Sequence, residues 1–563
     1  MAAAPITPIC EDEVPPVLKR QIALVPVLGL LLAVPMAAYA AGKPASEDQR
    51  LDAYVTARMA EGDGASLAAA RAYAQAIALD PASPDVASRA YRQAVLAGDR
   101  ALALKAAHTL DAVSMLPPDG TVLLLGDALV RGKWKEASAL LERIEQEGNF
   151  AFVVPFMQSW ISMKAGPYDP PVVPVAKPYA VFAVRYTEEQ LLLQRLALGD
   201  AAGAADTYAQ ARARGTAFGP QQRAAMAVRF YALGRGDLAR DLAGDMVSMK
   251  GCAATTYAFT PSAGLARLLA RLALDLMGQG EPNATLSIAR LASFADPADD
   301  DARLLVTRAA LVGEMAQAGR TEAEKIGPCS PAWPDAQNLR LRAMIMAGDG
   351  DEAVVQARRM AASLDVRSLR LLGDVLVQTG DNNGAVAAYS QARALLAEKD
   401  EPSLLLQLAS ALEQSGDWAQ AKPLLEKVIE RAPDSAAALN YIGYAMADRG
   451  EDLPRAIALL ERANRIAPRE PAFIDSLGWA LYKAGQSDKA LPLIESAVSA
   501  APGNAEINEH LGDILWALGR RFEARAAWRA ALAGLDDDKT ADKVRVRVMQ
   551  KLDFGVDSAA LKS

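Results

Sequence analysis

The sequence predicts an all-α protein built as a solenoid of stacked helical hairpins. A pattern recurs in its second half with small residues at equivalent positions, at residues 373, 409, 443, 478 and 512, in steps of 36, 34, 35 and 34. Apolar residues within each repeat fall three and four apart, which is the spacing of one helix face. The 563 residues are 52% hydrophobic but only 6% aromatic. This length exceeds one globular core but suits a solenoid, which grows by adding neighbours.

The repeat at residues 470–504 shows why each unit is expected to be two antiparallel helices. Ile474, Leu477 and Leu481 form an apolar stripe on a first helix. Gly478 lies on that stripe, where the lack of a side chain lets a second helix approach closely, and Gly485 ends the first helix. The second helix carries the remaining members of the pattern, Ala490, Ile494 and Ala497, and is followed by Pro502.

The same set of residues returns in four other repeats of the second half. Its members there are Gly373, Gly380, Ala385, Tyr389 and Ala392; Ala409, Gly416, Ala421, Leu425 and Pro433; Gly443, Gly450, Ala456, Leu460, Ala463 and Pro468; and Gly512, Gly519, Ala524, Trp528 and Ala531. This pattern resembles the tetratricopeptide repeat (TPR) family, whose period is about 34 residues. The resemblance implies a right-handed superhelix with regular repeats at 341–535, a divergent TPR-like solenoid at 41–340, and a capping helix and tail at 536–563.

The N-terminal segment is interpreted as a secretory signal peptide at 1–40, cleaved after Ala40. Residues 21–42 carry no charge and follow Lys19 and Arg20, and Ala38 and Ala40 form a small-x-small cleavage site. The alternative is an inner-membrane anchor formed by 21–42, because this apolar stretch is nearly long enough to span a bilayer. Cleavage predicts a periplasmic location.

The divergent half keeps the turn glycine and the small residue five positions later. These pairs are Gly98 and Ala103, Gly132 and Ala137, Gly199 and Ala204, Gly234 and Ala239, and Gly348 and Ala353. The first repeat is visible in its second helix, through Ala69, Tyr73, Ala76 and Pro81. Division of the exported chain by the period predicts roughly 12 to 14 hairpins.

Regularity fails at residues 165–180, which hold five prolines, and at 249–262 and 326–336. These segments are insertions on the rim of the solenoid or loops that contact a partner. Cys252 and Cys329 lie in the last two and form a possible disulfide in an oxidising compartment, although they are two hairpins apart. At the end of the chain, residues 536–552 predict an amphipathic closing helix with Val544, Val546 and Val548 near one side.

No catalytic constellation is expected, so the chain is predicted to be no enzyme and to need no cofactor. Only His108 and His510 occur, in separate repeats, and the net charge of −8 without basic runs argues against nucleic acid as a partner. The glycines at 126–132 imitate a phosphate loop but fit a helix and a turn better. The aspartates at 296–301 favour helix capping over a calcium site, so no metal is predicted.

The TPR resemblance implies a partner-binding groove on the concave side, lined by positions 5, 9 and 12 of each first helix. Carried onto this chain, these positions include the expected partner-binding residues Asn440, Tyr444, Asp475, Trp479, Tyr482, Glu509, Asp513 and Trp516. Aromatic side chains rimmed by carboxylates favour capture of a peptide or protein. The alternative for Tyr482 and Trp516 is packing between hairpins. Elsewhere in the family Lys and Asn at positions 5 and 9 clamp a terminal carboxylate. The three carboxylates at these positions here, Asp475, Glu509 and Asp513, would repel such a group, so that binding mode is not expected.

The runs at 439–450, 473–485 and 510–532 are similar to repeats of proteobacterial cell-envelope TPR proteins, some of them adaptors of a periplasmic carboxyl-terminal processing protease. The resemblance implies a scaffold or adaptor in the periplasm that binds proteins or peptides and presents substrates to an envelope protease. The alternative is a component of an outer-membrane or polysaccharide export complex.

Overall fold

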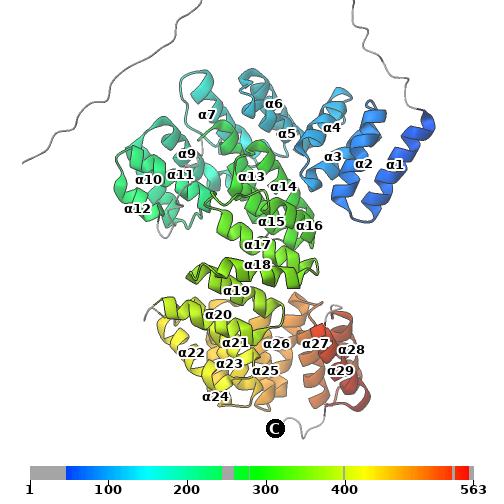
Figure 1. Cartoon of the computed structure of the whole chain (residues 1–563), viewed down its shortest axis with the longest axis vertical. Helices are drawn as coiled ribbons and strands as arrows, with labels where there is room; N and C mark the ends of the chain where they lie inside the picture. Colours follow the sequence, from blue (N-terminus) through cyan, green and yellow to red (C-terminus); the bar gives the residue numbers. More distant parts are fainter. Residues whose placement is uncertain are drawn as a thin grey trace, which may run out of the picture.

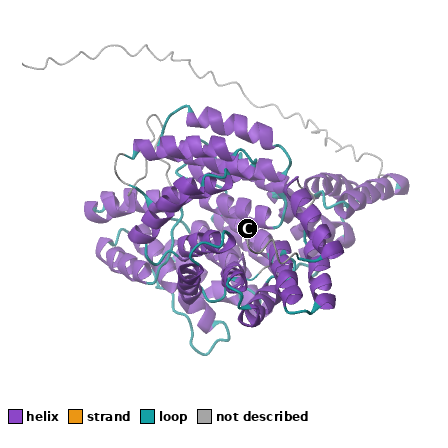
Figure 2. Cartoon of the chain, turned by 90° about the horizontal axis from the view of Figure 1, so that it is seen from below, coloured by secondary structure: helices purple, strands orange, loops and turns teal. Residues whose placement is uncertain are grey.

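The computed structural model describes residues 46–243, 259–277, 279, 281–396, 400–535 and 539–556, and within these ranges it contains helices and no strand. The helices follow one another as a continuous stack of pairs (Figure 1). Seen from below, they curve round in a ring (Figure 2). The prediction of an all-α solenoid is therefore confirmed.

The upper part of the molecule in Figure 1 runs from α1 to α16. Its helices are α1 Glu47–Gly62, α2 Ser66–Leu79, α3 Pro84–Ala97, α4 Arg100–Ala112, α5 Pro118–Val130, α6 Trp134–Glu147, α7 Val154–Ala165, α8 Ala180–Ala183, α9 Thr187–Leu198, α10 Ala201–Ala213, α11 Pro220–Ala232, α12 Gly236–Ala243, α13 Pro261–Met277, α14 Pro282–Ala295, α15 Asp300–Val312 and α16 Ala316–Ala323. Two short 3₁₀ helices lie at Ala151–Val153 and Val184–Tyr186.

The lower part runs from α17 to the closing helix α29. Its helices are α17 Trp333–Met346, α18 Gly350–Ala361, α19 Val366–Gln378, α20 Asn382–Leu395, α21 Pro402–Gln414, α22 Trp418–Arg431, α23 Ala436–Asp448, α24 Leu453–Ile466, α25 Pro471–Lys483, α26 Ser487–Ala500, α27 Ala505–Ala517, α28 Arg521–Ala533 and α29 Lys539–Phe554.

Consecutive helices pair as thirteen hairpins in the described ranges, from α1–α2 to α27–α28, with α7 and α8 standing between the third and fourth pairs. The predicted turn glycines lie between the two helices of their hairpins. Gly416 has a φ of +91° and Gly485 a φ of +74°, a left-handed conformation that glycine adopts without steric cost. Thirteen hairpins lie within the predicted 12 to 14, and repeat spacing predicted the turns of ten of them.

Small residues bring the two helices of a hairpin together, as the repeat pattern predicts. A Cβ atom added to Gly478 of α25 would lie 2.7 Å from Cδ1 of Ile494 on α26. Ala490, Ile494 and Ala497 of α26 are fully buried against it. The close approach of the two backbones is thus fixed by residues without room for a larger side chain.

The upper part departs from a simple stack, in which each hairpin contacts only its neighbours. Helix α14 packs on α5 and α3, and α13 packs on α5 and α7. A Cβ atom on Gly126 of α5 would lie 3.4 Å from Cα of Ala295 on α14, so these helices touch at a glycine. Helix α5 is buried from Gly120 to Leu129 as a result. Its run of apolar residues without a polar face was a sequence signal for this burial.

Buried charges also join helices that are distant in sequence. Arg267 of α13 is paired with Glu189 of α9, and Arg290 of α14 with Glu322 of α16, and all four side chains are buried. Removing one partner of such a pair leaves an uncompensated buried charge, which costs several kcal/mol. These pairs therefore specify how α9 to α16 fit together.

Two of the aspartates at 296–301, Asp299 and Asp301, cap helices. The Asp299 carboxylate accepts hydrogen bonds from the backbone N–H groups of Asp301 and Ala302 at the start of α15. The Asp301 carboxylate accepts from the N–H groups of Gln221 and Gln222, at 3.1 and 2.9 Å, and so caps α11. Burial, aided by the neighbouring carboxylates, raises the pKa of Asp299 to about 8. Throughout the part of the chain that the structure describes, no group of carboxylates, histidines and cysteines is arranged to hold a metal ion.

Two predicted irregular segments have the expected character. Residues 166–179 contain no helix, and 326–332 form the connection before α17. The leader 1–40, the candidate anchor 21–42, most of the loop at 249–262 and Cys252 lie outside the described residues. No described helix combines the length and the apolar character needed to cross a membrane.

The closing helix α29 is present, but one of its three valines is not on the predicted side. Val548 is fully buried and Val544 packs with it against α28, whereas Val546 is 58% exposed. The correction follows from helix geometry, because residues two apart point to different sides and residues four apart share one.

Candidate functional site

The first helices of the hairpins form the inner wall of the curved stack. Helix α23 contacts α25, α25 contacts α27, α15 contacts α17 and α17 contacts α19. The second helices α24, α26 and α28 do not pack on one another to this extent. Because first helices lie closer together than second helices, the side chains between them face the concave side of the solenoid.

Within each first helix, residues ten and six positions before the turn residue occupy this inner wall. With Gly450, Gly485 and Gly519 as turn residues, the predicted binding residues at these two positions are Asn440 and Tyr444, Asp475 and Trp479, and Glu509 and Asp513. The structure brings members of this set together from three successive hairpins. Most of these side chains are buried among neighbouring side chains and do not line an open groove.

Five side chains on this wall form a group that we call the inner cluster: Tyr444, Asp475, Trp479, Glu506 and His510. Asp475, Trp479 and His510 lie at its centre. The indole ring of Trp479 stacks on the imidazole of His510 at a centroid distance of 4.1 Å. Nδ1 of His510 lies 3.0 Å from both carboxylate oxygens of Asp475. Burial alone would lower the pKa of His510, but the Asp475 carboxylate raises it above 6.5.

The inner cluster extends across two repeats. The hydroxyl of Tyr444 on α23 donates a 2.7 Å hydrogen bond to Oε1 of Glu506 on α27, 62 residues away. The Tyr444 ring also lies 6.4 Å from the His510 ring. Burial raises the pKa of Tyr444, and the Glu506 carboxylate adds to the effect, so the phenol keeps its proton as hydrogen-bond donor. Tyr444 thus bridges the inner wall from α23 to α27.

Glu509 and Asp513 face the closing helix instead. Arg547 of α29 donates two hydrogen bonds of 2.7 Å to the Glu509 carboxylate. Lys551 donates 2.6 Å bonds to both Glu509 and Asp513. Burial opposes ionisation of Glu509, but Arg547 and Lys551 hold its pKa below the usual value. For Asp513 burial prevails over Lys551 and raises the pKa.

Most of the predicted binding residues are consequently enclosed by the protein itself. Asp475, Trp479, Tyr482, Glu509 and Asp513 are at most 9% exposed, and Asn440, Tyr444 and Trp516 are partly exposed. Trp516 packs on Trp528 at a centroid distance of 5.4 Å and lies against Gly555 beyond α29. The sequence reasoning missed His510, which lies beside position 5 rather than on positions 5, 9 or 12. A role of the eight residues in partner binding stays a prediction.

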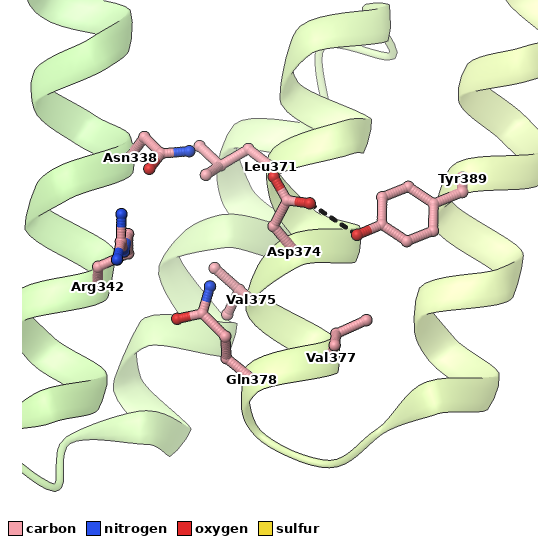
Figure 3. Close-up of a pocket in the computed structure, with 8 residues that line it drawn as sticks. All are labelled: Asn338, Arg342, Leu371, Asp374, Val375, Val377, Gln378 and Tyr389. Atoms are coloured by element: carbon pink, nitrogen blue, oxygen red, sulfur yellow. Dashed lines mark hydrogen bonds between the residues drawn. The ribbon is translucent and has the colours of Figure 1, made fainter. Parts of the chain in front are cut away.

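An open cavity lies instead on the inner wall between α17 and α19 (Figure 3). Its volume is about 350 Å³. It is lined by Asn338, Arg342, Leu371, Asp374, Val375, Val377, Gln378 and Tyr389. Asn338 and Arg342 lie on the left of Figure 3 on α17, and Tyr389 points from α20 on the right towards Asp374 of α19. The cavity therefore offers a guanidinium, a carboxylate and two amides on an apolar floor.

The carboxylate of Asp374 is fixed in place by its neighbours. Its Oδ1 accepts hydrogen bonds from the Tyr389 hydroxyl at 2.7 Å and from Nε2 of Gln407 at 2.6 Å. Burial raises the pKa of Asp374, against the lowering effect of these two donors. A Cβ atom at Gly373 would come within 2.3 Å of the Tyr389 ring, so the adjacent glycine makes room for the tyrosine.

The cavity occupies the repeat positions that the sequence reasoning assigned to binding in later hairpins. Asn338 and Arg342 lie ten and six residues before the turn residue Gly348, and Asp374 lies six before Gly380. Sequence reasoning applied these positions only from Asn440 onwards. The signal was available, since Gly348 marks the register of α17 as clearly as Gly450 marks that of α23.

Comparison with known proteins identifies the repeats in the lower part. A family model described as tetratricopeptide repeat matches residues 406–471 and 476–539. A TPR repeat-containing protein of Pseudomonas aeruginosa is 30% identical over 193 residues, which are 34% of this chain and 32% of the relative. Cellulose synthase 2 operon protein C of Komagataeibacter xylinus is 33% identical over 126 residues, 22% of this chain and 9% of that protein.

The human protein O-mannosyl-transferase TMTC1 is 26% identical over 172 residues, 30% of this chain and 19% of the transferase. Among solved structures, a thermophilic TPR protein of Thermus thermophilus covers 33% of this chain and 98% of its own, with 23% identity and a TM-score of 0.29. A TPR protein of Parabacteroides merdae covers 50% and 98%, with 13% identity and a TM-score of 0.34.

The chain thus spans about a third or less of the length of each of these curated relatives. The segments that match the family model coincide with α21 to α28. These are the regular hairpins, with glycine or alanine at each close helix contact. Repeats of this type generally mediate protein–protein interaction. Residues 406–471 and 476–539 match the tetratricopeptide repeat model, in a chain that folds over its described length as an all-α solenoid of helical hairpins.

Proposed function

We propose that the protein is a non-catalytic scaffold that binds a polypeptide along the inner wall of its solenoid. The observation that carries the proposal is the cavity between α17 and α19, where polar groups at the repeat's binding positions line an open space of about 350 Å³. A guanidinium and two amides over an apolar floor provide both specific hydrogen bonds and buried contact area for a peptide.

The binding surface starts at this cavity and continues towards the inner cluster, where Tyr444 and Asn440 remain partly exposed. Oδ1 of Asn440 is buried and has no hydrogen-bond partner among the described residues, so it leaves an acceptor unused on the same wall. These features support polypeptide binding along successive first helices.

The proposed location is the periplasm, with residues 1–40 acting as a cleaved signal. This aspect of the proposal rests on the uncharged run 21–42 and the alanines at 38 and 40. In that compartment the scaffold would act as an adaptor that presents a bound protein to an envelope protease. Sequencing the N-terminus of the protein recovered from the periplasm tests cleavage after Ala40, and an intact leader in a membrane fraction would indicate an anchor.

A photocrosslinking amino acid tests the binding surface in cells. Placed at Gln378 on the cavity, it should capture a partner polypeptide, whereas placement at the exposed Arg359 of α18 should not. Capture from both positions alike, or from neither, would contradict binding on the inner wall. Purified protein that turned over a substrate would contradict the non-catalytic role.

A second candidate function is a component of an outer-membrane or polysaccharide export complex. It is favoured by the 33% identity with cellulose synthase 2 operon protein C over 126 residues. Fractionation discriminates between the two. Firm co-sedimentation with an outer-membrane complex, resistant to high salt, supports the export role, and recovery in the soluble periplasmic fraction supports the adaptor.

A further inference from the structure

The inner wall of α15 and α17 carries two arginines at the same position of successive hairpins. Arg342 lies six residues before the turn residue Gly348, and Arg308 lies six residues before Glu314, which takes the turn position with a φ of +58°. Since α15 packs against α17, the two side chains belong to adjacent rungs of one wall. Adjacent helix axes in such packing are about 8 to 10 Å apart.

These arginines differ from the others on the same two helices. Arg303 is paired with Asp300, and Arg340 bonds to Gln337 and lies 3.6 Å from Glu324. Arg308 and Arg342 are both exposed, and neither makes a hydrogen bond or ion pair within the described residues. Asp374, which lines the same cavity as Arg342, accepts hydrogen bonds at its Oδ1 from Tyr389 and Gln407.

Each of the two arginines is accompanied by an exposed apolar side chain on the same helix face. Val312, four residues after Arg308, is 55% exposed, and Met346, four residues after Arg342, is 48% exposed. Residues four apart lie on one side of a helix. The wall therefore repeats a unit of one cationic and one apolar side chain. On α19 the same two positions hold Asp374 and Gln378, which end the series with an acid and an amide.

We propose that this arginine pair binds an extended segment of a partner protein that carries two acidic side chains about three residues apart. In the extended polyproline II conformation a chain has three residues per turn and advances about 3.1 Å per residue. Acids at i and i+3 therefore point to the same side and lie about 9 Å apart, which matches neighbouring helices. Apolar residues of the segment would contact Val312 and Met346. Asp374 would repel a third acid and so fix the register of the segment. The inference rests on the proposed binding function and names the chemistry of its partner.

Calorimetric titration with synthetic peptides tests the inference. The probe is a Gly/Ser peptide with two glutamates three residues apart and leucines between them, compared with the same peptide carrying lysines. The glutamate peptide should bind and the lysine peptide should not. Arg308→Gln and Arg342→Gln should each weaken binding by about tenfold, since a charge-assisted hydrogen bond is worth about 1.5 to 3 kcal/mol.

The matched control is Arg359→Gln, which removes an exposed charge from α18 and should leave the affinity unchanged. Arg308→Lys with Arg342→Lys keeps the charges and should retain part of the affinity, which separates recognition from a folding defect. The inference is overturned by equal binding of both peptides, by no binding of the glutamate peptide up to about 1 mM, or by unchanged affinity of the Gln variants.

Crosslinking in cells separates this failure from failure of the proposed function. If a crosslinker at position 378 captures a partner while the glutamate peptide does not bind, the scaffold function stands and the proposed recognition of acidic side chains is wrong. Should Gln378 capture nothing, the inner wall is not a binding surface. A captured partner should lose its crosslink in the double Gln variant.

Discussion

The indole of Trp479 lies nearly parallel to the imidazole of His510, with an angle of 15° between the rings and 4.1 Å between their centroids. The two residues come from α25 and α27, and His510 is held from below by Asp475 of α25. The stacked rings join the first helices of the last two hairpins, α25 and α27. This stack also places a titratable ring at the centre of their packing.

Stability of the lower part should depend on pH through His510. Its pKa in the folded protein is raised above 6.5 by Asp475, with Glu506 and Asp513 contributing in the same direction. A raised folded pKa gives stability that is complete below 6.5 and is lost as the pH rises through the folded pKa. The free energy of unfolding, measured with urea, should therefore differ most between the wild type and His510→Gln in mild acid. The two values should converge above the pKa of His510. A difference that grew with pH would contradict the assignment.

Filling the space at Gly373 should destabilise the hairpin of α19 and α20. In Gly373→Ala the new methyl group meets the Tyr389 ring at 2.3 Å, and overpacking of this kind costs about 1 to 3 kcal/mol. The midpoint of chemical unfolding should fall accordingly. Gly236→Ala is the matched control, because nothing lies within 4 Å of a Cβ atom there. Equal effects of the two changes would show that the close contact is not what matters.

Truncation of Lys551 should release the closing helix. Lys551→Ala leaves Glu509 and Asp513, both at most 3% exposed, without one of their cations, and breaking such a buried pair costs about 3 kcal/mol. Hydrogen exchange in α29 should accelerate before the rest of the protein unfolds. Lys543→Ala removes an exposed lysine from the same helix and should change little.

Cys252 and Cys329 should not react with alkylating reagents before reduction. Cys329 is disulfide-bonded in the structure, and the other cysteines, Cys10 and Cys252, lie outside the described residues. Pairing of Cys252 with Cys329 stays a prediction. Alkylation of unreduced protein followed by mass analysis should label neither residue, and reduction should expose both. Labelling of Cys252 in the unreduced protein would exclude the pair.

Local regularities predicted the hairpins, because a turn that needs a positive φ calls for glycine and a close helix contact calls for a small residue. Gly416 and Gly478 illustrate the two demands. The packing of α14 on α5 was not predicted, since it joins Gly126 to Ala295 across a long stretch of chain. Repeat spacing describes neighbours and carries no information about such contacts.

The family positions carried onto the late hairpins gave eight candidate binding residues, and partner binding by them stays a prediction. The spacing from the turn placed Tyr444 and Trp479 on one wall, and the structure agrees. Whether side chains on that wall are exposed depends on the curvature of the solenoid. The curvature results from the packing of many side chains between hairpins, which repeat spacing does not describe. The same spacing from Gly348 leads to Asn338 and Arg342, where the wall remains accessible.

The contact of α14 with α3 and α5 has a mechanical consequence. A chain pulled from its two ends would lose most of its lower hairpins in succession, because they are held mainly by their neighbours, apart from the Tyr444–Glu506 bond between α23 and α27. The upper hairpins are cross-braced, so their helices would resist together and give way in a single event. A scaffold made this way has a stiff base and a compliant arm, and the proposed binding surface on α15, α17 and α19 lies where the two meet.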